Sequence, residues 1–372
     1  MPESPRLVDL VQARLDAFLA ERGAHLRGIS PDLDVVDDGA RRLLAGGKRF
    51  RALFCYWGWR AVSAHAAEFD PFADDDGPDG LDAVVSIAAG LELFHAAALV
   101  HDDIMDNSDL RRGQPSAHRA FAALHAERGW DGSAEAYGMS AALLLGDLLL
   151  GWSDELVAEG VARVGGTAGR AARDEFTTMR TEVTAGQYLD IFEESAWRAL
   201  PEDELLSRAQ RVVVYKSAKY SVEAPLAIGG SLADGSLAQV AALREFGLPL
   251  GIAFQLRDDI LGVFGDPEVT GKPSGDDLRE GKRTVLVTLA RQKLPPTAAR
   301  LFDELLGDRT LDADQIAMLQ TAVRDSGAVD HVERAIAHQL EQARAALADA
   351  PLARSACDEL TALADAVTRR ES

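Results

Sequence analysis

Apolar residues recur every three or four positions almost throughout this chain, which is the spacing that places them on one face of an α-helix. The pattern is clear in LVDLVQARLDAFLAERG and in VERAIAHQLEQARAALADA. Segments with alternating β-branched residues are scarce, and the one candidate strand, QRVVVYKSAKYSV, also fits a helix, so we interpret it as a helix. The sequence therefore predicts an all-α protein with about a dozen helices.

The charge balance argues against two classes of function. The chain has 372 residues and a formal net charge of −21. Nucleic-acid binding needs clustered Lys and Arg to neutralise phosphates, and anionic membrane surfaces attract basic patches. We therefore expect neither nucleic acid nor a membrane surface among the partners.

Cysteine usage and hydropathy indicate the compartment. Cys55 and Cys357 form neither a metal-ligand spacing nor a disulfide framework, which indicates a reducing environment. The N-terminal segment has early charges and does not resemble a signal peptide. No run reaches the roughly 18 apolar residues of a spanning helix, since even SAALLLGDLLLGW is interrupted by Asp147. We expect a cytoplasmic protein without a membrane span.

Two acidic clusters each follow an apolar helical run. The first, in LVHDDIMDNSDLRRG, contains Asp102, Asp103 and Asp106, and the second, in FQLRDDILGVFGD, contains Asp258 and Asp259. A helix advances about 100° per residue, so Asp102 and Asp106 lie on one face, one turn apart. Oxygen ligands of this kind suit Mg²⁺, which prefers one or two carboxylates together with substrate phosphates. Two such clusters facing one cavity would hold a diphosphate through bridging metal ions.

A solvated acidic helix face is the alternative interpretation of each cluster alone. The preceding runs, LELFHAAALV and GLPLGIAFQL, are too apolar for a surface, and both place aspartates at the same end of the apolar stripe. Because the two clusters need each other and no long linker separates them, we predict one domain over residues 1–372.

Basic and polar residues that could bind a diphosphate accompany the clusters, as expected because Mg²⁺ neutralises only part of its charge. Alone, each of them also fits an ordinary role, such as a solvated cation or a cation at a helix C-terminus. His95 lies seven residues before Asp102, within about 20° of the same helix face, and could equally be a satisfied core histidine. The other candidates are Lys48, Arg49 and Arg51 in GGKRFR, Arg111 and Arg112 after the first cluster, Lys216, Ser217, Gln255, Lys272 and Lys282.

These motifs, in this order, resemble the trans-isoprenyl diphosphate synthases, the polyprenyl synthetase family of head-to-tail prenyl-chain elongating enzymes. The likeness runs from GGKRFR at residues 46–51 through EGKRT at residues 280–284. It implies a single helical bundle with a central active-site cavity, usually assembled as a homodimer. It also implies condensation of isopentenyl diphosphate with allylic prenyl diphosphates, assisted by about three Mg²⁺ ions per active site.

The resemblance also implies roles for individual residues. The metal ligands would be Asp102 and Asp106, supported by Asp103, and Asp258, with Asp259 nearby. The diphosphate of isopentenyl diphosphate would be bound by Lys48, Arg51, His95 and Arg112. The allylic diphosphate would be contacted by Arg111, Lys216, Ser217, Gln255 and Lys272, with Lys282 completing the set. Gln187 and Asp190 in GQYLD match a family position near the reacting carbons.

One position departs from the family pattern. The second cluster usually reads DDxxD, but Gly262 occupies the third acidic position here. We expect weaker or altered metal binding rather than loss of function. Asp266 would compensate only if the following loop folds back.

The product length would be set by residues on the helix before Asp102. Ala98 and Ala97 stand where the family's shortest-chain enzymes tend to place an aromatic residue, and Phe94 is a candidate floor of the channel. Two alanines leave the channel open, which favours geranylgeranyl diphosphate over farnesyl diphosphate; a longer polyprenyl product is an alternative. Small residues for helix packing are the simpler explanation of the same alanines.

Two other functions share parts of this pattern. A class I terpene cyclase would share the fold and the first aspartate cluster, but it has no need for a second diphosphate site. A non-catalytic partner subunit of another synthase would be expected to lose aspartates, and only the position of Gly262 has lost one.

Overall fold

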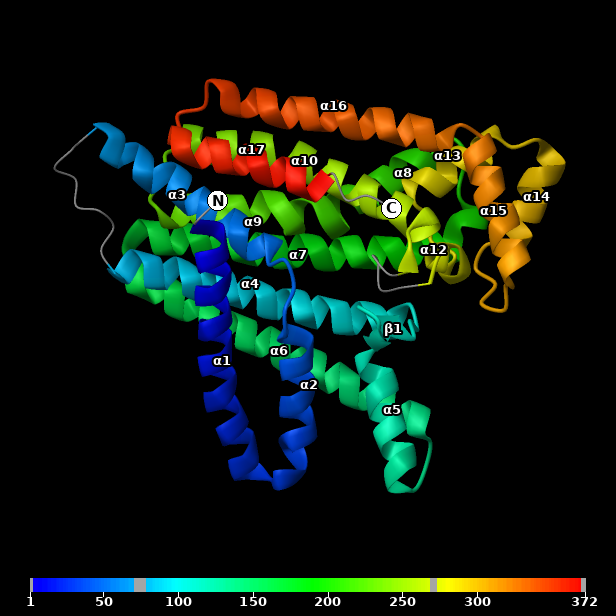
Figure 1. Cartoon of the computed structure of the whole chain (residues 1–372), viewed down its shortest axis with the longest axis horizontal. Coiled ribbons are helices and arrows are strands. Elements are labelled where there is room, and N and C mark those ends of the chain that lie inside the picture. The colour runs from blue at the N-terminus through cyan, green and yellow to red at the C-terminus, as the bar shows by residue number, and fades with distance from the viewer. Residues whose placement is uncertain (1–2, 70–77, 268–272, 369–372) are drawn as a thin grey trace. The chain divides into compact units, whose positions relative to one another are not determined.

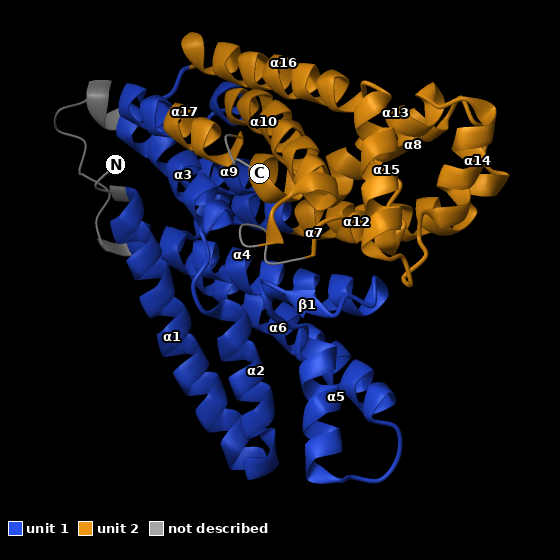
Figure 2. Ribbon diagram, turned by 45° about the vertical axis from the view of Figure 1, so that its right-hand side comes forward, with its two compact units in different colours: residues 1–176, 225–240, 351–359 blue, residues 177–224, 241–350, 360–372 orange. Residues whose placement is uncertain are grey.

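The computed structural model describes residues 3–69, 78–267 and 273–368, and almost all of them are helical. The chain divides into two compact units (Figure 2). Unit 1 comprises residues 1–176, 225–240 and 351–359, and unit 2 comprises residues 177–224, 241–350 and 360–372. Each unit is therefore assembled from three separate stretches of the chain. The prediction of one domain remains a prediction.

Unit 1 contains the N-terminal helices. Its elements are α1 (Glu3–Ile29), the 3₁₀ turn η1 (Pro31–Leu33), α2 (Asp34–Leu44), α3 (Phe50–Phe69), α4 (Pro78–Met105), strands β1 (Leu110–Arg111) and β2 (Gln114–Pro115), α5 (Ala117–Arg128), α6 (Ala134–Val164), the first part of α7 (Gly166–Ala196), most of α9 (Ala224–Leu232) and the start of α17 (Arg354–Thr368).

Helices α4 and α6 form the centre of unit 1 and lie side by side (Figure 1). Glycines let their backbones approach closely. A Cβ atom on Gly160 would lie 2.6 Å from the carbonyl oxygen of Ala83, and one on Gly90 would lie 3.1 Å from that of Ser153. The Ser153 hydroxyl donates a hydrogen bond of 2.7 Å to the Gly90 carbonyl. This packing fixes α4, the helix that carries His95 and the first acidic cluster.

Unit 2 contains the remaining elements. They are the rest of α7, the 3₁₀ turn η2 (Trp197–Ala199), α8 (Leu205–Val212), the π-helix η3 (Val213–Glu223), most of α10 (Leu237–Phe264), α12 (Asp276–Glu280), α13 (Val285–Lys293), α14 (Pro296–Leu305), α15 (Ala313–Asp325), α16 (Ala328–Ala348) and the end of α17. Its core joins α8, η3, α10, α13, α15 and α16 through buried residues such as Leu286, Val323 and Val332.

The segment that resembled a strand is a helix, as predicted, but it is wound as a π-helix over all of Val213–Glu223. The amide of Ala224 donates to the carbonyl of Lys219, five residues back. Glycines on α7 and α10 allow these helices to pack closely against this segment. A Cβ atom on Gly186 of α7 would lie 2.4 Å from the backbone nitrogen of Lys216, and one on Gly251 of α10 would lie 2.5 Å from the carbonyl oxygen of Ala218. π-Helical segments are rare and often occur at functional sites.

The structure confirms the all-α fold and adds two details that the sequence analysis missed. Residues 110–115 form a short antiparallel hairpin, with Leu110 opposite Pro115 and Arg111 opposite Gln114. In addition, two helices, Gly80–Met105 and Leu237–Phe264, are long and apolar enough by composition to span a membrane, contrary to expectation. In the first, 83% of the most apolar window is buried within the protein, and in the second 39%. Core helices meet the same criterion, so the absence of a membrane span stays a prediction.

Candidate active site

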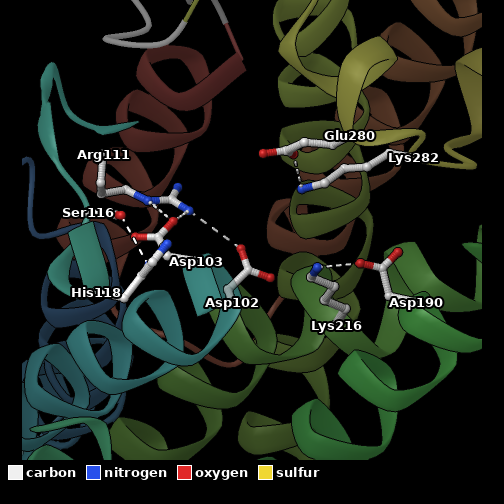
Figure 3. A network of polar contacts seen from close by, with 9 residues as sticks. All are labelled: Asp102, Asp103, Arg111, Ser116, His118, Asp190, Lys216, Glu280 and Lys282. Carbon is white, nitrogen blue, oxygen red and sulfur yellow. Dashed lines mark hydrogen bonds and ion pairs between the residues drawn. The ribbon is translucent and has the colours of Figure 1, made fainter. Parts of the chain in front are cut away.

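The first acidic cluster lies where α4 ends in unit 1. The amide of Asp106 donates to the carbonyl of Asp102 at 2.8 Å, so the helical spacing continues through the cluster. Asp103 and Asp106 are buried, whereas Asp102 is partly exposed. Arg111, on β1, donates from Nε to Asp103 Oδ1 at 3.0 Å, and its Nη2 lies 3.5 Å from Asp102 Oδ2 (Figure 3). The arginine predicted to contact the allylic diphosphate is thus held against two carboxylates.

The hairpin determines where its two arginines point. Its loop consists of Arg112 and Gly113, with φ angles of +54° and +72°. Positive φ at both central residues is the geometry of a tight type I′ hairpin, which favours glycine. Arg111 therefore lies on a strand beside the carboxylates, while Arg112 lies at the turn.

A basic cluster gathers around Arg112 in unit 1. A Cβ atom on Gly47, whose φ is +100°, would lie 3.5 Å from the Arg112 guanidinium. His95 is part of this cluster, because burial and then Arg51, Arg112, Arg111 and Arg49 lower its pKa well below the usual value. The imidazole is therefore neutral at pH 7.

Three of the four residues predicted to bind the diphosphate of isopentenyl diphosphate come together in this way: Arg51, His95 and Arg112. The fourth, Lys48, is exposed in the adjacent loop. Unit 1 therefore contains a basic cluster, and its role as a diphosphate site stays a prediction.

Arg49 has a different role from its neighbours. Its guanidinium is buried and donates to Glu92 Oε2 at 3.1 Å and to Gln12 Oε1 at 2.7 Å. The partners, Glu92 on α4 and Gln12 on α1, were missed in the sequence. An available signal was the charge of Glu92 inside the apolar run GLELFHAAALV, because a buried carboxylate needs a partner.

The second acidic cluster lies near the end of α10 in unit 2. Asp258 is partly exposed, and Asp259 is buried. Gln255, predicted to meet a phosphate, donates from Nε2 to Asp259 Oδ1 at 2.8 Å. Asp259 Oδ2 is buried without a hydrogen-bond partner. Burial, followed by the nearby charges of Asp277, Asp258 and Asp190, raises the pKa of Asp259 to about 8.

Two lysines of unit 2 are each paired with a carboxylate (Figure 3). Lys216, on the π-helix, pairs with Asp190 of α7. Lys282 pairs with Glu280 of α12 at 3.2 Å. Asp190 was predicted near the reacting carbons; in the structure it pairs with Lys216, and its charge contributes to the raised pKa of Asp259.

The remaining predicted residues have these positions. Ser217 and Gln187 are partly buried in unit 2, and Asp266 is exposed just beyond α10. Lys272 lies outside the described residues. The chain-length candidates lie on α4 in unit 1: Ala97 is fully buried, Ala98 is partly buried, and the ring of Phe94 packs edge-on against Phe176 with 6.1 Å between centroids.

The carboxylates fit Mg²⁺ in chemistry. In the described part of the chain, no three His, Cys, Asp or Glu side chains are arranged to hold an ion by themselves. Mg²⁺ needs only one or two protein carboxylates when phosphate and water oxygens supply the other ligands. The buried Oδ2 of Asp259 is the kind of oxygen that a cation or its water would satisfy.

The all-α fold, the two carboxylate clusters and the basic cluster around Arg112 are the features expected of a trans-prenyltransferase. The chain belongs to the polyprenyl synthetase family, whose sequence model it matches over residues 34–323. It is therefore an enzyme that transfers prenyl groups, and enzymes of this family use Mg²⁺.

Three similar proteins illustrate the relationship. A geranylgeranyl pyrophosphate synthase from Corynebacterium glutamicum, solved with isoprenyl diphosphate and magnesium, is 38% identical with a TM-score of 0.90, covering 98% of this chain and 99% of that one. A geranylfarnesyl diphosphate synthase from Aeropyrum pernix is 32% identical over 85% of this chain and 87% of its own length. A geranylgeranyl diphosphate synthase from Mycobacterium tuberculosis is 29% identical over 88% of this chain and 81% of its own.

Proposed function

We propose that this enzyme condenses isopentenyl diphosphate with an allylic prenyl diphosphate to form geranylgeranyl diphosphate. The observation that carries the proposal is the basic cluster of Arg51, His95 and Arg112 in unit 1. His95 lies on α4, at whose end the first acidic cluster lies. An anion site next to a carboxylate cluster suits a reaction between two diphosphates. A terpene cyclase uses one diphosphate and has no need for it.

Each unit supplies part of the chemistry. In unit 1, Asp102 and Asp106 would hold Mg²⁺, and in unit 2 Asp258 would hold a further ion, for about three in all. When bound, Mg²⁺ neutralises charge on diphosphate oxygens and so favours departure of pyrophosphate. Lys216 and Lys282 would add positive charge for the leaving group.

The neutral His95 would donate a hydrogen bond to the diphosphate of isopentenyl diphosphate without adding charge. Arg51, Arg112 and Lys48 would supply the charge there. Apolar side chains along α4 would keep water from the allylic cation until the alkene attacks and a proton is lost. Released pyrophosphate is the proposed base.

The proposed product length rests on the difference in solvent exposure between two adjacent alanines. Ala97 has no exposed surface, so it packs in the core, whereas Ala98 retains some exposure and can face a prenyl chain. A small residue at Ala98 allows a chain longer than farnesyl. A geranylfarnesyl product is the second candidate, because a relative of that name is 32% identical.

The test is incubation of the purified chain with Mg²⁺, isopentenyl diphosphate and dimethylallyl, geranyl or farnesyl diphosphate, with product sizing by chromatography. Geranylgeraniol after dephosphorylation would support the proposal, and a longer alcohol would favour the second candidate. No extension from any primer would support a non-catalytic partner subunit, and a cyclic hydrocarbon would support a cyclase.

Two variants separate the roles of the alanines. Ala98→Phe should shorten the product while the protein stays folded. Ala97→Phe should instead overpack the core and destabilise the fold by about 1–3 kcal/mol or more. An unchanged product from a folded Ala98→Phe variant would refute the channel assignment.

We also propose a cytoplasmic homodimer that uses the exposed face of α6. Met139, Leu143 and Leu144 on this helix are 46%, 50% and 67% exposed, which is unusual for large apolar side chains gathered on one helix. Light scattering after gel filtration should give twice the chain mass. Leu144→Glu should yield monomers, and Ala317→Glu, which adds the same charge at an exposed position of α15, should leave the dimer intact.

A further inference from the structure

A cavity within unit 2 is lined by residues of α7, η2, α8 and α13. It encloses about 410 Å³ of space between the atoms, counted out to its mouth. Its wall is mainly apolar, and the apolar lining comes from Trp197, Leu205, Ala209 and Val287. None of the residues that line this cavity was predicted to contact a substrate or a metal ion.

A buried cation faces this apolar wall. Arg283, which precedes α13, lines the cavity, and its side chain is only 12% exposed. Its Nε and Nη1 atoms are buried, and neither has a hydrogen-bond partner among the described residues. Burial is the main reason why the pKa of Arg283 is lowered to about 10, so the group still carries its charge at pH 7. A buried charge with unused donors is costly, which makes an acceptor in the cavity favourable.

The neighbouring carboxylates are bound to other arginines. Both oxygens of Asp303 accept hydrogen bonds from Arg291 Nε, at 2.8 and 2.9 Å. Arg283 Nη1 lies 3.6 Å from Asp303 Oδ1, which is beyond hydrogen-bond distance. Glu193 lines the cavity, but both of its oxygens accept from Arg208 Nε, at 2.9 and 3.0 Å. These two carboxylates therefore leave the donors of Arg283 for another acceptor.

The indole of Trp197 holds the guanidinium in place. Cζ of Arg283 lies 3.6 Å from the centroid of the Trp197 ring, so the planar group packs against the face of the indole. Arg198 and Arg291 lie farther from the same ring, at 5.1 and 5.6 Å. Stacking uses the flat face of a guanidinium and leaves the N–H groups at its edges for hydrogen bonds. Arg283 is thus positioned without its donors being used.

We propose that this cavity binds a small organic anion, a monocarboxylate with a compact apolar body. The carboxylate accepts hydrogen bonds from Arg283, and the apolar body lies against Leu205, Ala209 and Val287. One carboxylate matches the charge of one guanidinium, whereas a diphosphate brings more negative charge than this cavity can neutralise. The site is separate from the prenyl-transfer chemistry and adds a ligand that the reaction does not require.

The test uses benzoate as the probe and its neutral amide, benzamide, as the matched control ligand. Affinity is measured by isothermal titration calorimetry in the presence of Mg²⁺ and saturating pyrophosphate, which occupy the active site. Tryptophan fluorescence locates the binding, because Trp197 is in unit 2 and the other four tryptophans are in unit 1. We expect saturable binding of benzoate with a change in fluorescence, and no such binding of benzamide.

A pair of arginine variants tests the role of the buried cation. Arg283→Gln should weaken benzoate binding about 10–100-fold, because it removes charge-assisted hydrogen bonds to the carboxylate. Its Tm should not fall markedly, since the variant also removes a costly buried charge. The matched control is Arg198→Gln, the same substitution at an exposed arginine that also lies near Trp197, and it should bind benzoate as the wild type does.

A third variant tests the cavity itself. Ala209→Leu adds a side chain to the apolar wall and should weaken benzoate binding while Arg283 stays in place. This variant keeps the proposal testable if Arg283→Gln folds poorly.

Four results would overturn the proposal. They are no saturable binding of benzoate to the folded wild type, equal affinity for benzamide, unchanged benzoate affinity in folded Arg283→Gln, and binding that pyrophosphate abolishes. The last result would place benzoate in the active site. None of them bears on the proposed prenyl transfer, which is tested separately by product analysis.

Discussion

The buried pair of Arg49 and Glu92 separates the structural from the substrate-binding part of the GGKRFR motif. The two side chains are 3% and 5% exposed, and Arg49 Nη1 lies 3.1 Å from Glu92 Oε2. Arg49 also donates to Gln12 and to the carbonyl of Leu44, so one guanidinium connects α1, α2 and α4 with the loop before α3. We predict that this pair stabilises unit 1 and positions the neighbouring cations.

The expected magnitude follows from the burial of both charges. Removing one partner leaves a charge that water cannot reach, which costs about 3–5 kcal/mol. In Arg49→Met, Glu92 keeps its contact with the Ala52 amide, but at 3.4 Å this bond is too weak to compensate. Replacing both, as in Arg49→Met with Glu92→Leu, removes the unpaired charge and should cost much less than the sum of the single variants.

The assay is urea unfolding followed by tryptophan fluorescence. Four of the five tryptophans lie in unit 1, so the signal reports mainly on that unit. The control is Arg42→Met, the same substitution at an exposed arginine of α2, which should change the free energy of unfolding by less than about 0.5 kcal/mol. A loss below about 1 kcal/mol in Arg49→Met, or strictly additive single variants, would refute the reasoning.

Three further predictions concern catalysis and pH. Asp102→Ala should lower kcat about 10³-fold or more at an unchanged Tm, and a large fall in Tm would instead indicate a structural role. His95 stays neutral when folded but binds a proton below about pH 6.5 when unfolded, so the ligand-free protein should lose stability on acidification below that pH. His95→Asn should reduce this slope in thermal melts. The raised pKa of Asp259 has the opposite effect on stability. In the folded protein Asp259 keeps its proton up to a pKa of about 8, whereas in the unfolded chain the carboxyl group ionises from about pH 4. Stability in EDTA should therefore fall as the pH rises between these values, and Asp259→Asn should flatten the fall; an unchanged profile would contradict the assignment.

The periodicity of apolar residues predicted the helices because each helix is long enough for the pattern to repeat. It could not predict the hairpin at residues 110–115, whose strands of two residues each have no repeat. The π-helix could not be predicted from the sequence for another reason. Gly186 and Gly251 allow two other helices to pack closely against the backbone of the π-helix. Such tertiary packing cannot be read from the local sequence.

The charged motifs were visible in the sequence because their residue types suit diphosphate and Mg²⁺. Arg51 and Arg112 lie close enough to His95 to lower its pKa, and the diphosphate-binding role that the resemblance implies for them stays a prediction. Roles that depend on a partner far along the chain were not visible. Arg49 lies two positions before Arg51 in the same motif, and its buried pair with Glu92, 43 residues away, could not be read from the motif.

Gly262 shows that a linear motif does not describe which residues from other elements lie beside it. A DDxxD pattern places its last carboxylate one helical turn beyond the first, since helix geometry brings the two to the same face. The same region of space can also be reached from a second element, and α12 brings Asp277 there while glycine leaves the necessary room. The contacts involve only the end of the Asp277 side chain, so a side chain at position 262 requires that carboxylate to move.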